Sequence, residues 1–200
     1  MLRGFVFALC TVWSAAAAAA GTVLVYGDSL SAAYGIREKD GWVSLLGERL
    51  KPRNYTVANA SISGETTSGG AARIKDALER FRPEVLVVAL GGNDGLRGLP
   101  VAEMKANLAA IVRAAQARKA RVLLVGIRVP PNYGRKYTEE FFQAFAEVAG
   151  QHKTAYVPFL LEGVGERREL FQPDQIHPTA AAQPVMLDTV WRGLEPLLRK

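Results

Sequence analysis

The chain has 200 residues, which is room for one domain of ordinary size with its own core. Hydrophobic residues make up 49% of it and charged residues 22%, values that exclude a disordered or fibrous protein. Lys and Arg outnumber Asp and Glu by 25 to 19, a formal net charge of +6. The basic residues are scattered, and clusters such as Arg118-Lys119 and Arg167-Arg168 are short. The charge pattern therefore argues against nucleic-acid binding and would equally suit a nearby anionic membrane surface.

The first twenty residues have the pattern of a targeting segment. Arg3 is their only charged residue, and it is followed by an apolar run and then by the alanines of 15–20. A basic start, an apolar stretch and a small-residue end are typical of a secretory signal peptide, and the stretch is short for a membrane anchor, which is the alternative. We predict a signal peptide at 1–20, a mature domain at 21–200, and export to a bacterial periplasm or secretion.

The remaining chain alternates between two kinds of hydrophobic pattern. Short apolar runs rich in Val, Leu and Ile predict strands at 22–26, 55–58, 85–90, 122–127 and 155–157. Helical spacing of apolar residues lies between them, at 42–50, at 74–81 before Pro83, from a first helical residue Pro100, at 138–150 and at 179–198. Continuous apolar strands separated by amphipathic helices predict a parallel sheet covered on both faces. We expect a single-domain α/β protein, a three-layer α/β/α sandwich with a five-stranded parallel, flavodoxin-like sheet.

Ligands of such sheets bind beyond the carboxyl ends of the strands, and polar segments follow the predicted strands there. The first strand is followed by GDSLS at 27–31, the second by NASISGET at 59–66 and the third by GGNDG at 91–95. DQIHP at 174–178 precedes the last predicted helix. These four segments are therefore the candidates for a functional site.

The four segments supply the groups that nucleophilic acyl transfer requires. That chemistry needs a hydroxyl, a base, a carboxylate that orients the base, and hydrogen-bond donors for the oxyanion. His177 stands three residues after Asp174, in a turn favoured by the proline that follows it. Ser29 offers a hydroxyl at the end of the first strand, while Gly64 and Asn93 offer a backbone N–H and a side-chain amide.

Each of these residues also has an ordinary structural interpretation. Ser29 is in the position of a helix N-cap, and Gly64 is a typical turn glycine. Asn93 is suited to an Asx-turn, Asp174 to a cap or turn, and His177 to a hydrogen-bonded turn. Taken one at a time, these residues leave both interpretations open.

Taken together, GDSLSAAYG at 27–35, ASISGETT at 60–67, GGNDGLRG at 91–98 and DQIHP at 174–178 resemble the four sequence blocks of the SGNH/GDSL hydrolases. The resemblance is closest to the bacterial periplasmic branch of acyl-CoA thioesterase I, lysophospholipase and arylesterase. IRVPPNYGRKY at 127–137 is similar to the same branch, so the resemblance spans nearly the whole predicted mature chain.

The resemblance implies a role for each candidate residue. Ser29 is the nucleophile, His177 the base and Asp174 the group that orients it, while the Ser29 N–H, Gly64 and Asn93 form the oxyanion hole. The implied enzyme is a serine esterase and thioesterase that hydrolyses acyl-CoA, lysophospholipid or aryl ester. It needs no metal or organic cofactor and acts on small molecules as a monomer.

Apolar residues on the same loops are candidates for an acyl-chain trough, although simple loop packing explains each of them equally well. They are Leu30, Tyr34, Leu96, Leu99, Pro130, Pro131 and Tyr133. Transient contact with membrane lipid is a further expectation. Ala33 stands where this branch often has glycine, a departure that adds a methyl group near the nucleophile turn.

Other functions fit the sequence less well. GETTSGG at 64–70 lacks the Lys-Ser/Thr of a phosphate-binding loop, and Ser29 is not in a G-x-S-x-G turn. Two separated histidines and the one cysteine, Cys10 in the predicted signal peptide, are a poor zinc site. The alternatives that remain are an acyltransferase that uses the same acyl-enzyme and a non-catalytic lipid- or glycan-binding protein on this fold.

Overall fold

The computed structural model describes residues 21–198, which form one five-stranded parallel sheet in the order β2-β1-β3-β4-β5. Each neighbouring pair of strands is parallel, and β1 pairs with β2 on one side and with β3 on the other. The strand order confirms the flavodoxin-like sheet expected from the sequence. The strands are β1 (Gly21–Gly27), β2 (Tyr55–Asn59), β3 (Val85–Ala89), β4 (Arg121–Val125) and β5 (Ala155–Val157).

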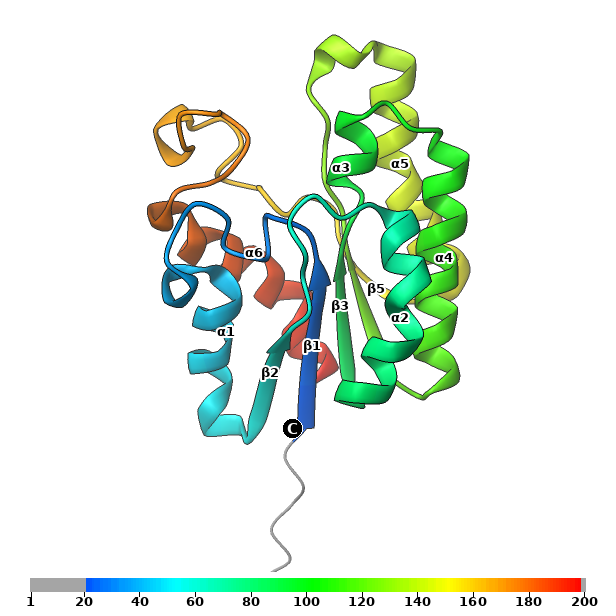
Figure 1. Cartoon of the computed structure of the whole chain (residues 1–200), viewed down its shortest axis with the longest axis vertical. Helices are drawn as coiled ribbons and strands as arrows, with labels where there is room; N and C mark the ends of the chain where they lie inside the picture. Colours follow the sequence, from blue (N-terminus) through cyan, green and yellow to red (C-terminus); the bar gives the residue numbers. More distant parts are fainter. Residues whose placement is uncertain (1–20, 199–200) are drawn as a thin grey trace, which may run out of the picture.

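Helices cover both faces of the sheet and complete the three layers (Figure 1). Two helices lie on one face, α1 (Trp42–Leu50) and α6 (Gln183–Leu194). Three lie on the other, α2 (Thr67–Phe81), α4 (Val101–Ala117) and α5 (Arg135–His152). A short helix, α3 (Gly92–Leu96), follows β3 at the carboxyl edge. None of the helices within residues 21–198 combines the length and apolar character needed to cross a membrane.

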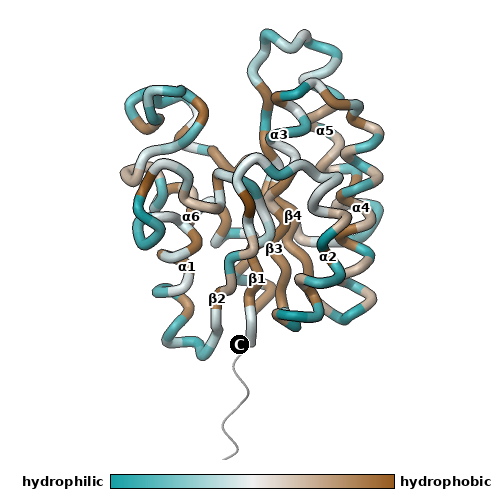
Figure 2. The backbone as a smooth tube through the Cα atoms, viewed as in Figure 1, coloured by the Kyte–Doolittle hydropathy of each residue, from teal (hydrophilic) through white to brown (hydrophobic). Residues whose placement is uncertain are grey.

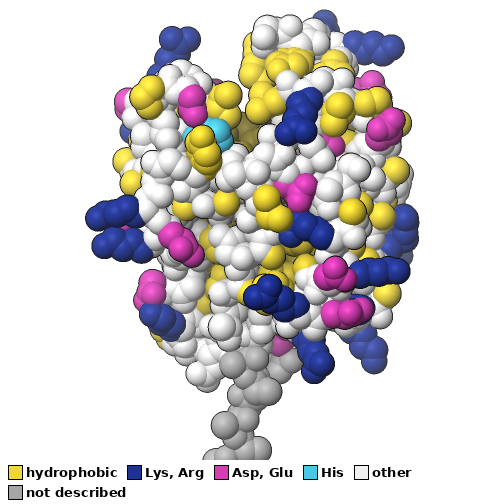
Figure 3. Space-filling model, in the orientation of Figure 1, with side chains coloured by type: hydrophobic (Ala, Val, Ile, Leu, Met, Phe, Trp, Pro, Cys, Tyr) yellow, Lys and Arg dark blue, Asp and Glu magenta, His cyan; other side chains and the backbone are white. Residues whose placement is uncertain are grey.

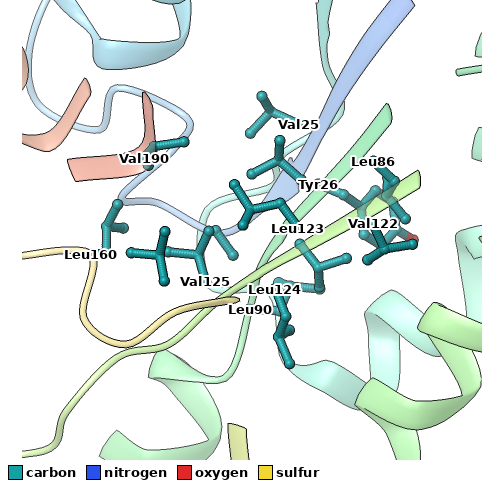
Figure 4. Close-up of a cluster of buried hydrophobic side chains, with 14 of the residues drawn as sticks. Val25, Tyr26, Leu86, Leu90, Val122, Leu123, Leu124, Val125, Leu160 and Val190 are labelled. Carbon is teal, nitrogen blue, oxygen red and sulfur yellow. The ribbon is translucent and has the colours of Figure 1, made fainter. Parts of the chain in front are cut away.

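The core lies on both faces of the central strands. Every residue of β3 is buried, as are those of β1 from Val23 onward and of β4 from Val122 onward. Figure 2 shows these strands as the most hydrophobic part of the chain. In the close-up of Figure 4, Val125, Leu160 and Val190 bring a strand, a loop and α6 together. Burial on both faces explains why the strands read as continuous apolar runs rather than as alternating ones.

Several local details differ from the sequence predictions. Pro100 is the N-cap of α4 rather than its first helical residue. The predicted helix at 179–198 is divided into the 3₁₀ turn Ala180–Ala182, α6 and the 3₁₀ turn Glu195–Leu197, and Pro196 stands within the last turn. Proline lacks a backbone N–H and therefore disrupts a regular helix. The predicted signal peptide lies outside the described residues.

The topology brings three of the four polar segments to one place. From β1 the chain runs to β2 on one side, and after α2 it returns to β3 on the other. The loops that follow these three strands therefore start side by side at the carboxyl edge, and neighbouring loops then leave the sheet in opposite directions. Open α/β sheets bind their ligands in the crevice at such a point. Ile62 N–H, in the loop after β2, donates to Gly27 O at the end of β1 over 3.0 Å.

Candidate active site

Three side chains at the carboxyl edge form a hydrogen-bonded chain. Ser29 Oγ lies 2.9 Å from His177 Nε2, although 148 positions separate the two residues in sequence. The other ring nitrogen, Nδ1, lies 2.7 Å from Asp174 Oδ2. A hydroxyl, an imidazole and a carboxylate in this order are the arrangement that activates a serine nucleophile.

The turn after β1 positions Ser29. Gly27 leaves no room for a side chain, because a Cβ there would lie 2.7 Å from Ser31 Oγ and 2.9 Å from Ala89 O. Ser31 and Ala32 N–H both donate to Asp28 O, so the chain turns sharply as soon as the strand ends. Ser29 is left half-buried at this turn. The Ser29 N–H donates to no group in the described part of the chain.

The loop that carries His177 is held by its own backbone. Asp174 Oδ1 accepts hydrogen bonds from the N–H groups of Ile176 and His177, each over 3.0 Å. Gln172 N–H donates to His177 O over 2.8 Å. The Tyr34 ring lies against the imidazole, with the two ring centroids 4.4 Å apart. These contacts fix the orientation of the imidazole toward Ser29.

Hydrogen bonds also set the ionisation of Asp174. The bond to the His177 ring, followed by the backbone N–H groups of His177 and Ile176, lowers the pKa of Asp174 from 3.8 to about 2. The carboxylate is therefore charged at any pH near neutrality. A charged acceptor holds the proton of the imidazole on Nδ1 and leaves Nε2 free to accept the proton of Ser29.

The two other predicted donors lie on the loops after β2 and β3. Gly64 has φ +79° in the left-handed region, where a side chain would be strained, and its N–H has no acceptor among residues 21–198. Asn93 Nδ2 donates to Glu65 O over 3.0 Å and lies 3.4 Å from Asp28 Oδ2. The amide therefore has one firm hydrogen bond and one long contact.

Two buried acidic residues support this edge, and both were missed in the sequence analysis. Asp28 is 3% exposed and accepts the Leu30 N–H over 3.0 Å. Burial raises its pKa to about 6, while the Leu30 N–H acts in the opposite direction. Asp94, also 3% exposed, accepts the Thr67 hydroxyl at 2.5 Å and the Thr67 N–H at 2.9 Å. An acid in a glycine-rich turn directly after an apolar strand is the signal that marks both.

The seven residues proposed for an acyl-chain trough occupy different environments. Tyr34 and Leu96 are among the large hydrophobic residues that remain exposed. Leu30 is half-buried against the core. The Leu96 and Leu99 carbonyls accept hydrogen bonds from the hydroxyls of Tyr133 and Tyr137. Pro130 and Pro131 are exposed at the loop before α5.

The tyrosine contacts join the loop before α5 to α3. Tyr133 stacks on Tyr137 with ring centroids 6.2 Å apart, Tyr137 stacks on Phe141, and Phe141 meets the buried Phe145 edge to face. Figure 3 shows this edge of the molecule hollowed between two raised lobes, with hydrophobic side chains in the hollow.

Residues 21–198 hold no group of three or more His, Cys, Asp or Glu side chains that could bind a metal ion.

Comparison with known proteins agrees with the sequence blocks. Residues 25–184 match the model of the GDSL-like Lipase/Acylhydrolase family. The chain belongs to this family. It is therefore an enzyme of the acyl hydrolase class, and its three-layer architecture is that of the SGNH hydrolases.

Close relatives of this GDSL-family chain carry names from the same class. It is 52% identical over 183 residues to Esterase TesA of Pseudomonas aeruginosa, covering 90% of this chain and 91% of that one. It is 40% identical over 182 residues to Thioesterase 1/protease 1/lysophospholipase L1 of Escherichia coli, covering 91% and 87%. The crystal structure of TesA superposes with a TM-score of 0.86 and 51% identity, over 88% of this chain and 99% of that one. The psychrotrophic esterase EstA from Pseudoalteromonas sp., inhibited by monoethylphosphonate, gives a TM-score of 0.83 with 37% identity, over 88% and 97%.

Proposed function

We propose that the protein is a serine hydrolase that cleaves acyl esters and thioesters through a covalent acyl-enzyme. The observation that carries the proposal is the contact of Ser29 Oγ with His177 Nε2 at 2.9 Å, backed by Asp174 at 2.7 Å. We assign Ser29 as the nucleophile, His177 as the general base and then acid, and Asp174 as the residue that orients and stabilises the imidazolium.

In the first half of the reaction the Ser29 hydroxyl attacks the acyl carbonyl carbon and His177 Nε2 takes its proton. Negative charge collects on the former carbonyl oxygen, where the N–H groups of Ser29 and Gly64 and the Asn93 amide stabilise it. The second Asn93 N–H makes only the 3.4 Å contact with Asp28, so it is the N–H of this amide that is available to the oxyanion. His177 then protonates the departing alcohol or thiol.

In the second half water takes the place of the alcohol. His177 accepts a proton from water as the water oxygen attacks the acyl-enzyme, the same donors hold the oxyanion, and Ser29 leaves with the proton. The steps assigned to this chain use its own side chains, the backbone N–H groups of Ser29 and Gly64, and water.

The proposed substrates are small acyl esters and thioesters of the classes acyl-CoA, lysophospholipid and aryl ester. The relatives named esterase, thioesterase and lysophospholipase, and the arylesterase of Vibrio mimicus at 38% identity, support this range. The exposed Tyr34 beside His177 and the exposed Leu96 on α3 support an apolar acyl-chain trough at the same edge. We further propose that the enzyme is exported, works as a monomer and contacts membrane lipid transiently. Fractionation of cells that express the tagged full chain tests the export.

Replacement of Ser29 by alanine tests the chemistry. We expect S29A to lose hydrolysis of p-nitrophenyl acyl esters and labelling by a fluorophosphonate, with unchanged thermal unfolding. The matched control is S68A, because Ser68 is an exposed serine of α2 outside the proposed machinery. Undiminished hydrolysis or labelling in S29A would overturn the assignment.

Product analysis with added glycerol distinguishes a hydrolase from an acyltransferase, since only the latter gives acylglycerol as the main product.

A further inference from the structure

A partly buried arginine joins the two ends of the turn that carries Gly64. Arg73 lies on α2, and its Nη1 donates to Ala60 O over 2.8 Å. Its Nε donates to Glu65 Oε2 over 2.7 Å. Ala60 and Glu65 stand on either side of Gly64, so one guanidinium group closes the loop from 60 to 65 into a ring.

The guanidinium group is itself held in place. It lies over the ring of Tyr26 with 4.1 Å between Cζ and the ring centroid. Tyr26 is fully buried in β1, and its hydroxyl donates to Gly70 O in α2 over 2.7 Å. The Arg73 and Glu65 side chains are only 24% and 13% exposed. A planar, partly desolvated and charge-assisted contact of this kind fixes geometry better than a surface ion pair does.

The same loop is tied to the second oxyanion donor. Asn93 Nδ2 donates to Glu65 O over 3.0 Å, so the residue that Arg73 anchors also aims the Asn93 amide. From the other side, Arg97 Nη2 donates to Gly64 O over 3.0 Å. The relative position of Gly64 and Asn93 therefore depends on Glu65, and the position of Glu65 depends on Arg73.

We propose that Arg73 is a positioning residue for the transition state. It holds the Gly64 N–H and the Asn93 amide at the relative position in which both can donate to the oxyanion. The inference rests on the proposed function, in which these two groups are oxyanion donors. Displacements of about 1 Å in such groups cost up to about 10²-fold in rate, and the loss falls on the transition state rather than on the bound substrate.

The test compares R73M with R73K and with the control R80M. Arg80 lies on the same helix, is exposed, and contacts only the ring of Phe81 among the described interactions. For R73M we expect kcat on p-nitrophenyl butyrate to fall about 10- to 100-fold, with KM changed less than about twofold. Affinity for a trifluoromethyl ketone, which forms an oxyanion on Ser29, should fall in parallel with kcat, while inhibition by free butyrate stays unchanged.

Two further readouts separate positioning from general stability. A lysine side chain cannot bond to both Ala60 O and Glu65 Oε2 as the guanidinium group does. The kcat of R73K should therefore lie between those of wild type and R73M. Millimolar guanidinium chloride, far below denaturing concentrations, should restore part of the activity of an R73A variant and none in N93A.

Equal losses of ketone and butyrate affinity in R73M, or an unchanged kcat, would overturn the proposal. The variant N93A keeps this failure distinct from failure of the proposed function. If N93A loses kcat and ketone affinity while R73M does not, only the role of Arg73 is wrong. If N93A is as active as wild type, the oxyanion assignment itself is wrong.

Discussion

The buried carboxyl of Asp28 predicts a specific dependence of stability on pH. It is 3% exposed, and burial raises its pKa from 3.8 to about 6. Between these two pH values the folded protein holds a proton that the unfolded chain releases, so unfolding becomes more favourable as the pH rises. The contribution to stability is therefore fully present below pH 3.8 and lost above about pH 6. The interval between the two pKa values corresponds to about 3 kcal/mol.

The variant D28N removes this titration while its side-chain carbonyl can still accept the Leu30 N–H. We expect the free energy of unfolding of D28N, relative to wild type, to rise by about 3 kcal/mol between pH 3.5 and pH 7. Urea denaturation at a series of pH values measures it, and other titrating groups cancel in the difference between the two proteins. If the free energies of unfolding of the two proteins change with pH in parallel over this range, the raised pKa of Asp28 is refuted.

Two further substitutions test the site and its backbone. D174N should lower kcat about 10³- to 10⁴-fold with little change in KM. The Asn carbonyl oxygen would stay with the backbone N–H groups of Ile176 and His177, so the NH2 group would face Nδ1, donate to it and move the imidazole proton to Nε2. Steady-state kinetics measure this, and a loss below about tenfold would contradict the role of Asp174. A33G should raise the free energy of unfolding by about 0.5–1 kcal/mol, since Ala33 has φ +57° in the left-handed region. Urea denaturation checks this, and a stability equal to or below that of wild type would contradict the strain at Ala33.

The sheet was predictable from the sequence because its central strands are buried on both faces. Continuous apolar runs at β3 and β4 and helical spacing between them are local patterns, and parallel order follows from their alternation. The spacing of Asp174 and His177 is also local, so that contact could be inferred from the sequence. The contact of His177 with Ser29 joins residues far apart in the sequence, so it could only be proposed from the order of the polar segments and their resemblance to a known family.

The features that could not be predicted from the sequence depend on contacts between distant residues. α3 occupies a segment of glycines, Asn and Asp that has weak helix propensity, and the buried Asp94 joins it to Thr67 on α2. Arg73 looks like any solvated residue of an amphipathic helix until Ala60 and Glu65 are placed beside it. Long-range polar contacts of this kind leave no periodic signal in a single sequence.

The separation of Ser29 and His177 by 148 positions has a consequence for the making of this protein. The serine lies directly after β1, the first strand of the fold, and the imidazole lies in the loop before α6, the last helix. On the proposed chemistry, a chain whose C-terminal part has not yet been synthesised has the hydroxyl but lacks His177, so it cannot hydrolyse an ester. The antiparallel bridge between Phe171 and Pro178 closes the loop that carries His177, so on this chemistry hydrolysis depends on the folding of the C-terminal part of the chain.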